Sequence, residues 1–371
     1  MRVALVHYWL VNMRGGEKVL ESLCRLYPHA DIYTHVLEPN RLSPLLRSKT
    51  IHTTFINRLP GSSTHYQKYL PLMPLALEQL DLRAYDLVIS SESGPAKGVI
   101  TRADTAHLCY CHSPMRYLWD FYQDYLEDAG QATRLVMRPL FSRLRQWDVA
   151  SAGRADRILA NSHTVARRIA RWWRREAAVV HPPVDTSPYL LNRAPAPDAP
   201  YLCLGQLVPY KRTDLAVQAC SETGRPLIVA GEGKDRARLE RMAGPSVRFV
   251  GRVDDAEAAR LYASCRALIF PGEEDFGMVP VEAMAAGCPV IAYGRGGALE
   301  TVRDNETGLF FANQSVPSLL EALKRFETRE SFDPAILRSQ AERFNETVFH
   351  EKIQAEVEAC LKAVRTSNVL P

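Results

Sequence analysis

The chain has 371 residues, of which 46% are hydrophobic and 24% charged, as in an ordinary soluble globular protein. This length is long for one hydrophobic core and predicts about two domains. The formal net charge of +4 is too small to argue for a nucleic-acid partner.

The cysteine pattern and the apolar runs indicate the redox compartment of the protein and the kind of membrane contact that it can make. The cysteines show no CxxC pair and no metal-ligand spacing, which favours a reduced, cytosolic protein without a structural metal. The apolar start, 3–11, is followed by Gly15, Gly16 and Glu17 rather than by a small-residue cleavage site. No apolar run approaches the ~18 residues that a membrane span needs. Any membrane contact is therefore expected to be peripheral.

The first half of the chain alternates short apolar runs with helical segments, which is typical of a parallel α/β sheet. After the first run, Gly15 and Gly16 form a tight loop, and a helix is expected from Glu17. Such a loop lets backbone approach a ligand closely, although a plain turn explains it equally well. His112 follows another run, but lone histidines are more often structural than catalytic. Strands are predicted at 3–8, 30–35, 86–90, 106–110, 156–162 and just before 181.

Two segments of this half are both basic and aromatic. Residues 55–82 suit either an interfacial surface patch or a core-facing amphipathic helix interrupted by Pro71 and Pro74. Residues 167–175, RRIARWWRR, could bind anionic lipid. For these we favour a solvated charged face whose tryptophans dock on the core.

The second half repeats the alternation after a linker at 186–199 that is rich in Pro and Ala. The predicted domains are therefore 1–185 and 200–343. A long final helix from Phe344 has no strand partner, so we assign 344–371 to the first domain. Strands are predicted at 201–205, 226–230, 247–251, 267–270 and 289–293, and helices at 213–223 and 255–265. Residues 305–311 and helices from about 316 complete the domain.

Lys211 and Arg212 lie just beyond the strand predicted at 201–205. Two adjacent cations suit a diphosphate, whose negative charge grows as it leaves a sugar. The alternative is an ordinary basic helix start, but cations there oppose the helix dipole.

Glu274 and Glu282 are spaced as E-x7-E across a turn that opens a helix, with Pro280 in its first turn and Gly287 beyond its end. We place Glu274 in the loop and Glu282 in the first turn. The simple alternative is a solvated loop acid and a carboxylate favoured by the helix dipole. The free amides at such a helix start form a ready phosphate site, here those of Gly277, Met278 and Val279.

Taken in order, these motifs resemble those of retaining glycosyltransferases of family 4. The resemblance implies an α/β protein with the glycosyltransferase-B fold, two facing Rossmann-like domains with a C-terminal helix crossing back to the first. The strongest motif is the E-x7-E pair. The supporting residues, in the expected order, are Gly15, Gly16, Glu17, His112, Lys211, Gly231, Glu232, Gly233, Gly296 and Gly297.

The resemblance also implies roles for individual residues. Glu282 would bind the ribose, and Glu274 the hydroxyls of the donor sugar near the anomeric carbon. Lys211, with Arg212, would neutralise the diphosphate, and His112 would contact the donor sugar and assist the transition state. Gln206 stands where family members often carry an arginine, which leaves the identity of the second cation undetermined. The remaining implied contacts to the nucleotide sugar are Gly15, Gly16, Gly231, Gly233, Phe276, Gly277, Met278 and Val279.

Within the family, residues 111–119 and 70–76 resemble bacterial mannosyltransferases of O-antigen, capsule or exopolysaccharide synthesis. The implied reaction moves mannose from GDP-mannose to a lipid-linked saccharide by front-face attack, with no cofactor or metal. It would occur in the cytoplasm, with peripheral contact to the anionic inner face of the cell membrane. The alternatives are a UDP-sugar donor, a sugar-nucleotide epimerase or a non-catalytic nucleotide-sugar-binding subunit.

Overall fold

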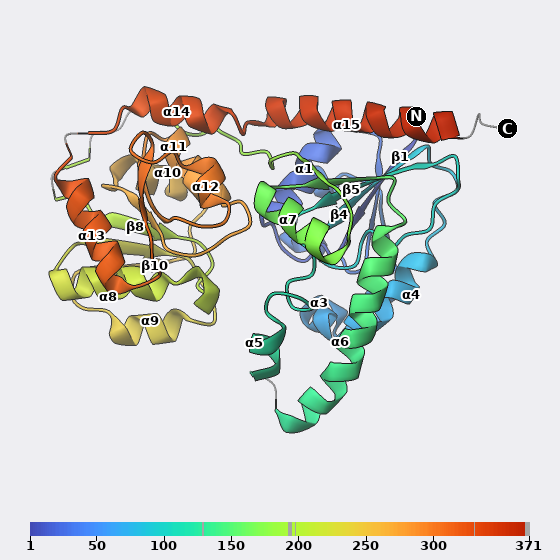
Figure 1. Cartoon of the computed structure of the whole chain (residues 1–371), viewed down its shortest axis with the longest axis horizontal. Helices are drawn as coiled ribbons and strands as arrows, with labels where there is room; N and C mark the ends of the chain where they lie inside the picture. Colours follow the sequence, from blue (N-terminus) through green and yellow to red (C-terminus); the bar gives the residue numbers. More distant parts are fainter. Residues whose placement is uncertain (128–129, 192–194, 197, 330, 368–371) are drawn as a thin grey trace. The chain divides into compact units, whose positions relative to one another are not determined.

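The computed structural model describes the chain except residues 128–129, 192–194, 197, 330 and 368–371 (Figure 1). It divides into two compact units, Met1–His181 with Phe349–Pro371, and Pro182–Val348. The predicted linker lies partly outside the described residues, and Tyr189, which lies within it, is buried in the second unit. No described helix is long and apolar enough to cross a membrane.

The first unit is built on a parallel sheet of seven strands in the order β3-β2-β1-β4-β5-β6-β7. The order reverses between β1 and β4, and there the register places His7 opposite Ser91. Ligands of open α/β folds bind at the carboxyl ends of strands at such a reversal. The strands are β1 (Val3–His7), β2 (Asp31–Thr34), β3 (Ile51–Thr53), β4 (Leu87–Glu92), β5 (Ala106–Cys111), β6 (Arg157–Ala160) and β7 (Ala178–Val179).

Helices cover this sheet, and the segment 55–82 forms short helices rather than one long one. Pro71 lies inside one of them and Pro74 is the second residue of the next, so the prolines prevent one continuous helix. Met73 and Leu77 are buried while Leu75 is exposed, as in the core-facing alternative. The helices are α1 (Gly15–Leu26), α2 (Pro44–Arg47), α3 (Ser62–His65), α4 (Met73–Glu78), α5 (Tyr122–Glu127), α6 (Gln131–Ala152) and α7 (His163–Trp172), with 3-10 turns η1 (Pro39–Arg41), η2 (Phe55–Arg58) and η3 (Tyr66–Leu72).

The last helix, α15 (Glu346–Ser367), packs on the first unit, as predicted (Figure 1). Phe349, Ile353 and Val357 enter the same apolar core as the inner face of α1. His350 Nε2 lies 2.9 Å from Ser22 Oγ on that helix. The chain's final segment therefore completes the core that its first residues begin.

The second unit repeats the plan with the strand order β10-β9-β8-β11-β12-β13, all parallel, which reverses between β8 and β11. The molecule is thus an α/β protein with two Rossmann-like halves, as predicted. The strands are β8 (Tyr201–Leu204), β9 (Leu227–Ala230), β10 (Val247–Gly251), β11 (Leu268–Phe270), β12 (Val290–Tyr293) and β13 (Gly308–Phe311). The helices are α8 (Thr213–Thr223), α9 (Arg236–Met242), α10 (Asp255–Ser264), α11 (Met278–Ala285), α12 (Ala298–Thr301), α13 (Val316–Glu327) and α14 (Pro334–Glu342), with the 3-10 turn η4 (Pro209–Lys211).

Of the two predicted end signals of helix α11, Pro280 is its third residue and Gly287 lies beyond its end. Gly277 precedes it with φ of 87°, and Gly287 follows it with φ of 74°, a conformation that favours glycine. Because the helix begins at Met278, Glu282 lies beyond its first turn, one position later than the sequence predicted.

Candidate functional site

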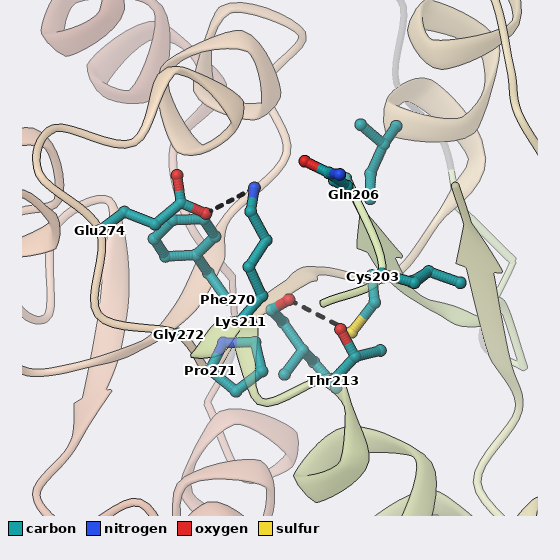
Figure 2. A pocket seen from close by; sticks show the side chains of 12 residues that line it. Cys203, Gln206, Lys211, Thr213, Phe270, Pro271, Gly272 and Glu274 are labelled. Atoms are coloured by element: carbon teal, nitrogen blue, oxygen red, sulfur yellow. Dashed lines mark hydrogen bonds and ion pairs between the residues drawn. The ribbon is translucent and has the colours of Figure 1, made fainter. Parts of the chain in front are cut away.

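A pocket opens in the second unit at the carboxyl ends of β8 and β11 (Figure 2). It lies where the strand order reverses, the usual ligand position of an open α/β sheet. Its lining residues are Cys203, Leu204, Gly205, Gln206, Leu207, Lys211, Thr213, Ile269, Phe270, Pro271, Gly272 and Glu274.

Lys211 and Glu274 meet in this pocket. Lys211 ends the η4 turn after β8, and Glu274 follows β11, so the two loops bring them together. Lys211 Nζ lies 2.8 Å from Glu274 Oε1, and each side chain is about one-fifth exposed, at 19% and 20% (Figure 2). The pair places one cation for a phosphate beside one carboxylate that can accept hydrogen bonds from hydroxyls.

Glycines bring the pocket loops into contact. A Cβ on Gly231 would lie 1.8 Å from the carbonyl oxygen of Gly205, and one on Gly233 would lie 2.0 Å from that of Leu207. A larger residue at either position would push the β9 loop away from the β8 loop, which carries Lys211. Packing alone therefore accounts for these two predicted glycines, whatever they contact in a ligand.

The start of α11 is supported by a second glycine loop. The amide of Gly297 donates to the carbonyl oxygen of Glu274 at 2.8 Å, and a Cβ on Gly297 would lie 2.2 Å from that of Phe276. The loop that carries Glu274 is thus held from behind. The first amides of α11, among them those of Met278 and Val279, lack partners within the helix, as at any helix start.

Glu282 and Arg212 have partners of their own. Tyr262 donates from its hydroxyl to Glu282 Oε2 at 3.1 Å, and burial raises the pKa of Tyr262 well above its ordinary value, so it remains a donor. Arg212, with φ of 52°, donates from Nε to Asp214 Oδ1 at 3.1 Å. Neither Glu282 nor Arg212 lines the pocket. Gln206 does line it, but as an uncharged side chain.

In the first unit, His112 follows β5. Gly15 and Gly16 are the first two residues of α1 rather than a loop before it, so the helix begins two residues earlier than the sequence predicted. His112 Nε2 lies 2.8 Å from Ser91 Oγ, and His7 Nδ1 lies 2.9 Å from the same oxygen. Burial and the nearby His7 lower the pKa of His112 to about 3, so His112 is neutral at physiological pH. A Cβ on Gly16 would lie 2.1 Å from the Tyr8 hydroxyl, which gives this glycine a packing role.

The sequence did not point to Ser91 or His7. Both lie inside apolar strands, where serine and histidine carry no motif. Their one signal is position, because both stand at the carboxyl ends of strands that turn out to be neighbours. Recognising it requires the strand order.

Two family models match successive parts of the chain. The first, described as Glycosyltransferase Family 4, matches residues 13–188, and the second, Glycosyl transferases group 1, matches residues 192–347. Together with the two Rossmann-like halves, they place the chain among the glycosyltransferases with the glycosyltransferase-B fold. The chain belongs to glycosyltransferase family 4.

Curated relatives agree with this assignment, and a solved structure shows the same fold. A GDP-mannose-dependent alpha-mannosyltransferase of Mycolicibacterium smegmatis is 32% identical over 44% of this chain and 46% of that protein. One of Mycobacterium tuberculosis with the same description is 34% identical over 42% and 43%. The matches thus span just under half of the relatives' length. The crystal structure of Anabaena HepE in complex with UDP-glucose has a TM-score of 0.69 at 16% identity, covering 97% of this chain and 100% of that chain.

Proposed function

We propose that the protein transfers mannose from GDP-mannose to a lipid-linked saccharide, with retention of configuration, in bacterial surface-polysaccharide synthesis. The observation that carries the proposal is the Lys211 and Glu274 pair, set in a pocket at the strand reversal of the second unit. Mannose and GDP are supported by the description shared by the two mycobacterial relatives.

In this proposal each group has one task. Lys211 Nζ neutralises the diphosphate, with the amides of Gly277, Met278 and Val279 at the start of α11 as further donors. Glu274 accepts hydrogen bonds from the sugar's hydroxyls, and Glu282 those of the ribose. Arg212 would assist Lys211 by releasing Asp214.

The reaction exchanges one bond at the anomeric carbon. The bond to the phosphate oxygen breaks as the acceptor oxygen bonds to the same face, and the acceptor's proton passes to the departing phosphate oxygen. In the proposal His112 contacts the donor sugar, and Gly15 and Gly16, the first two residues of α1, approach the phosphates. The growing negative charge on the phosphate is what Lys211 stabilises.

The proposal includes peripheral contact with an anionic membrane, because the acceptor is attached to a lipid. Exposed apolar and basic side chains on α6 support it: Leu135 is 76% exposed and Val136 66%, and Arg138 and Arg143 are exposed on the same helix. The site of action is then the cytoplasmic face of the inner membrane.

Replacing Glu274 by alanine tests the assignment of the site. We expect Glu274→Ala to lower kcat by about a hundredfold or more, because the sugar loses an acceptor near the reacting carbon, while nucleotide affinity stays within about threefold. The neighbouring Glu273→Ala is the matched control, since Glu273 does not line the pocket. Transfer by Glu274→Ala at the wild-type rate would contradict the role assigned to Glu274.

The donor is tested by thermal shift with GDP-mannose, UDP-glucose, UDP-GlcNAc, GDP and UDP. A ligand present at about 100 times its Kd stabilises the folded state by about 2.7 kcal/mol, so the preferred base gives the largest shift. A UDP-sugar donor is the second candidate, because the HepE structure holds UDP-glucose. Isomerisation of the donor without acceptor would instead identify an epimerase.

A further inference from the structure

Four polar side chains form a row across the strand reversal of the first unit. Glu17 comes from α1, His7 from the end of β1, Ser91 from β4, and His112 follows β5. Ser91 Oγ lies 2.9 Å from His7 Nδ1 and 2.8 Å from His112 Nε2. His7 Nε2 lies 3.9 Å from Glu17 Oε1. Of the four, only His112 is partly exposed.

The serine couples the proton positions of the two histidines. A hydroxyl has one hydrogen, so Ser91 can donate to only one of the two ring nitrogens. The other nitrogen must then carry a hydrogen and donate to Ser91. The tautomer of His112 is therefore set by the state of His7.

The surroundings of His7 select one arrangement. Its Nε2 is buried and makes no hydrogen bond among the described residues, and the group facing it is the Glu17 carboxylate. A lone pair there would face negative charge, so a hydrogen on Nε2 is electrostatically favoured. The neutral ring that carries this hydrogen on Nε2 keeps its lone pair on Nδ1.

The remaining protons follow from that state. Ser91 donates to His7 Nδ1, and Ser91 Oγ accepts from a hydrogen on His112 Nε2. His112 Nδ1 is then left with a lone pair, and the described residues offer it no hydrogen bond. The backbone of His112 is also held, because its amide donates to the carbonyl oxygen of Glu92 at 2.8 Å. The free ring nitrogen is thus a fixed acceptor.

We propose that Glu17, His7 and Ser91 are positioning residues that hold His112 as the Nε2–H tautomer and present its Nδ1 to a sugar hydroxyl as a hydrogen-bond acceptor. The identity of that ligand rests on the proposed function. The arrangement of protons does not, because it follows from contacts within the first unit.

Nitrogen NMR of the full chain labelled with nitrogen-15 histidine tests the tautomer directly. Long-range proton–nitrogen correlations at neutral pH show which ring nitrogen carries the hydrogen, and His112→Asn assigns the signals. We expect Nε2–H in the wild type. In Ser91→Ala we expect a mixture of tautomers, because the orienting hydroxyl is gone. Nδ1–H in the wild type, or an unchanged pattern in Ser91→Ala, would overturn the proposal.

The matched control is the neighbouring Ser90→Ala. Ser90 Oγ lies 2.9 Å from Nε2 of the buried His107, so this variant removes a similar bond outside the row. It should leave the His112 signals unchanged. A change equal to that in Ser91→Ala would mean that the strand, and not the row, is responsible.

Activity provides the second readout. Ser91→Ala should lower kcat/KM for transfer about tenfold, the usual scale of one oriented hydrogen bond, whereas Ser90→Ala should stay within about twofold. Ser91→Thr keeps the hydroxyl and should restore both the tautomer and most of the rate. If no donor supports transfer by the wild type, the proposed function fails while the NMR result still decides the tautomer.

Discussion

Lys97 is a charged side chain that the first unit buries completely. Its Nζ donates to Glu92 Oε1 at 3.1 Å and also to Asp148 Oδ1. Asp148 Oδ2 accepts from the indole nitrogens of Trp119 and Trp173, each at 2.8 Å. Burial raises the pKa of Glu92, whereas burial lowers that of Lys97 but the attraction of Asp148 and Glu92 raises it overall. The cluster joins β4 to α6 and to the residue after α7.

Removing the Lys97 charge should be strongly destabilising. Lys97→Met leaves two buried carboxylates without their cation, and we expect the free energy of unfolding to fall by about 3–5 kcal/mol. The control is Arg83→Met, whose partner Asp81 is exposed, and it should change the same quantity by less than about 1 kcal/mol. Urea unfolding measures both. Similar small effects would show that the buried cluster is not essential for stability.

Two buried histidines make stability depend on pH. Burial lowers the pKa of His35 and of His107 to about 4, below the ordinary value of 6.5. Between pH 6.5 and 4 the unfolded chain therefore binds more protons than the folded chain. The stability that comes from keeping these histidines neutral is complete above pH 6.5 and is lost as the pH falls towards 4. Each histidine should make the free energy of unfolding about 2 kcal/mol lower at pH 5 than at pH 7. His107→Gln should lose correspondingly less between pH 7 and 5, and an equal loss would contradict the assignment.

The packing around helix α7 decides between two interpretations of its sequence, lipid binding and docking of its tryptophans on the core. Trp173, just after the helix, is buried and donates to Asp148, and Trp172 stacks on Trp119 with ring centroids 5.4 Å apart. The tryptophans dock on the core, as the favoured alternative predicted. They are not available for lipid.

Helix α6 is therefore the better candidate for membrane contact. It is long and stands out from the sheet of its unit (Figure 1), and its one acidic residue, Asp148, is buried. Its exposed cations and its apolar Leu135 and Val136 fit an anionic lipid surface.

Vesicle sedimentation tests this surface. The wild type should sediment with anionic vesicles at low salt and be released at high salt, because salt screens charge. Leu135→Ser with Val136→Ser should reduce binding severalfold, since apolar insertion is lost. Leu299→Ser, which removes a leucine that is 56% exposed in the second unit, is the control. Equal sedimentation with neutral lipid would argue against the electrostatic mode, and full binding by the double variant would exclude this face of α6.

At the scale of the whole molecule, the final segment divides its apolar residues between two cores. Phe344 packs in the second unit, with its ring centroid 5.3 Å from that of Phe276. Phe349, five residues later, packs in the first unit, against Tyr110 at 5.7 Å. The first unit is therefore completed by chain from the far end of the sequence, whereas the second is completed by the last residues of its own continuous span.

Hydrogen exchange on the intact chain can separate the two cores. Phe349→Ala should destabilise the first unit by about 3–5 kcal/mol and lower amide protection in β4 and β5. Phe344→Ala, the matched variant, should lower amide protection in β11 and β12. Equal loss of protection in both units from either change would show that they unfold as one.

The sequence by itself determined the alternation of strands and helices, the two halves and the E-x7-E loop. The spacing of apolar residues and the effects of glycine and proline on the backbone act over only a few residues, so they can be recognised in the sequence. It also indicated Lys211 and Glu274 as members of one site. Only the tertiary structure decided which strands are neighbours, and hence that Lys211 touches Glu274, that Arg212 is paired with Asp214, and that His7 and Ser91 stand beside His112. These contacts join residues whose separation along the chain carries no local signal, so no sequence pattern could reveal them.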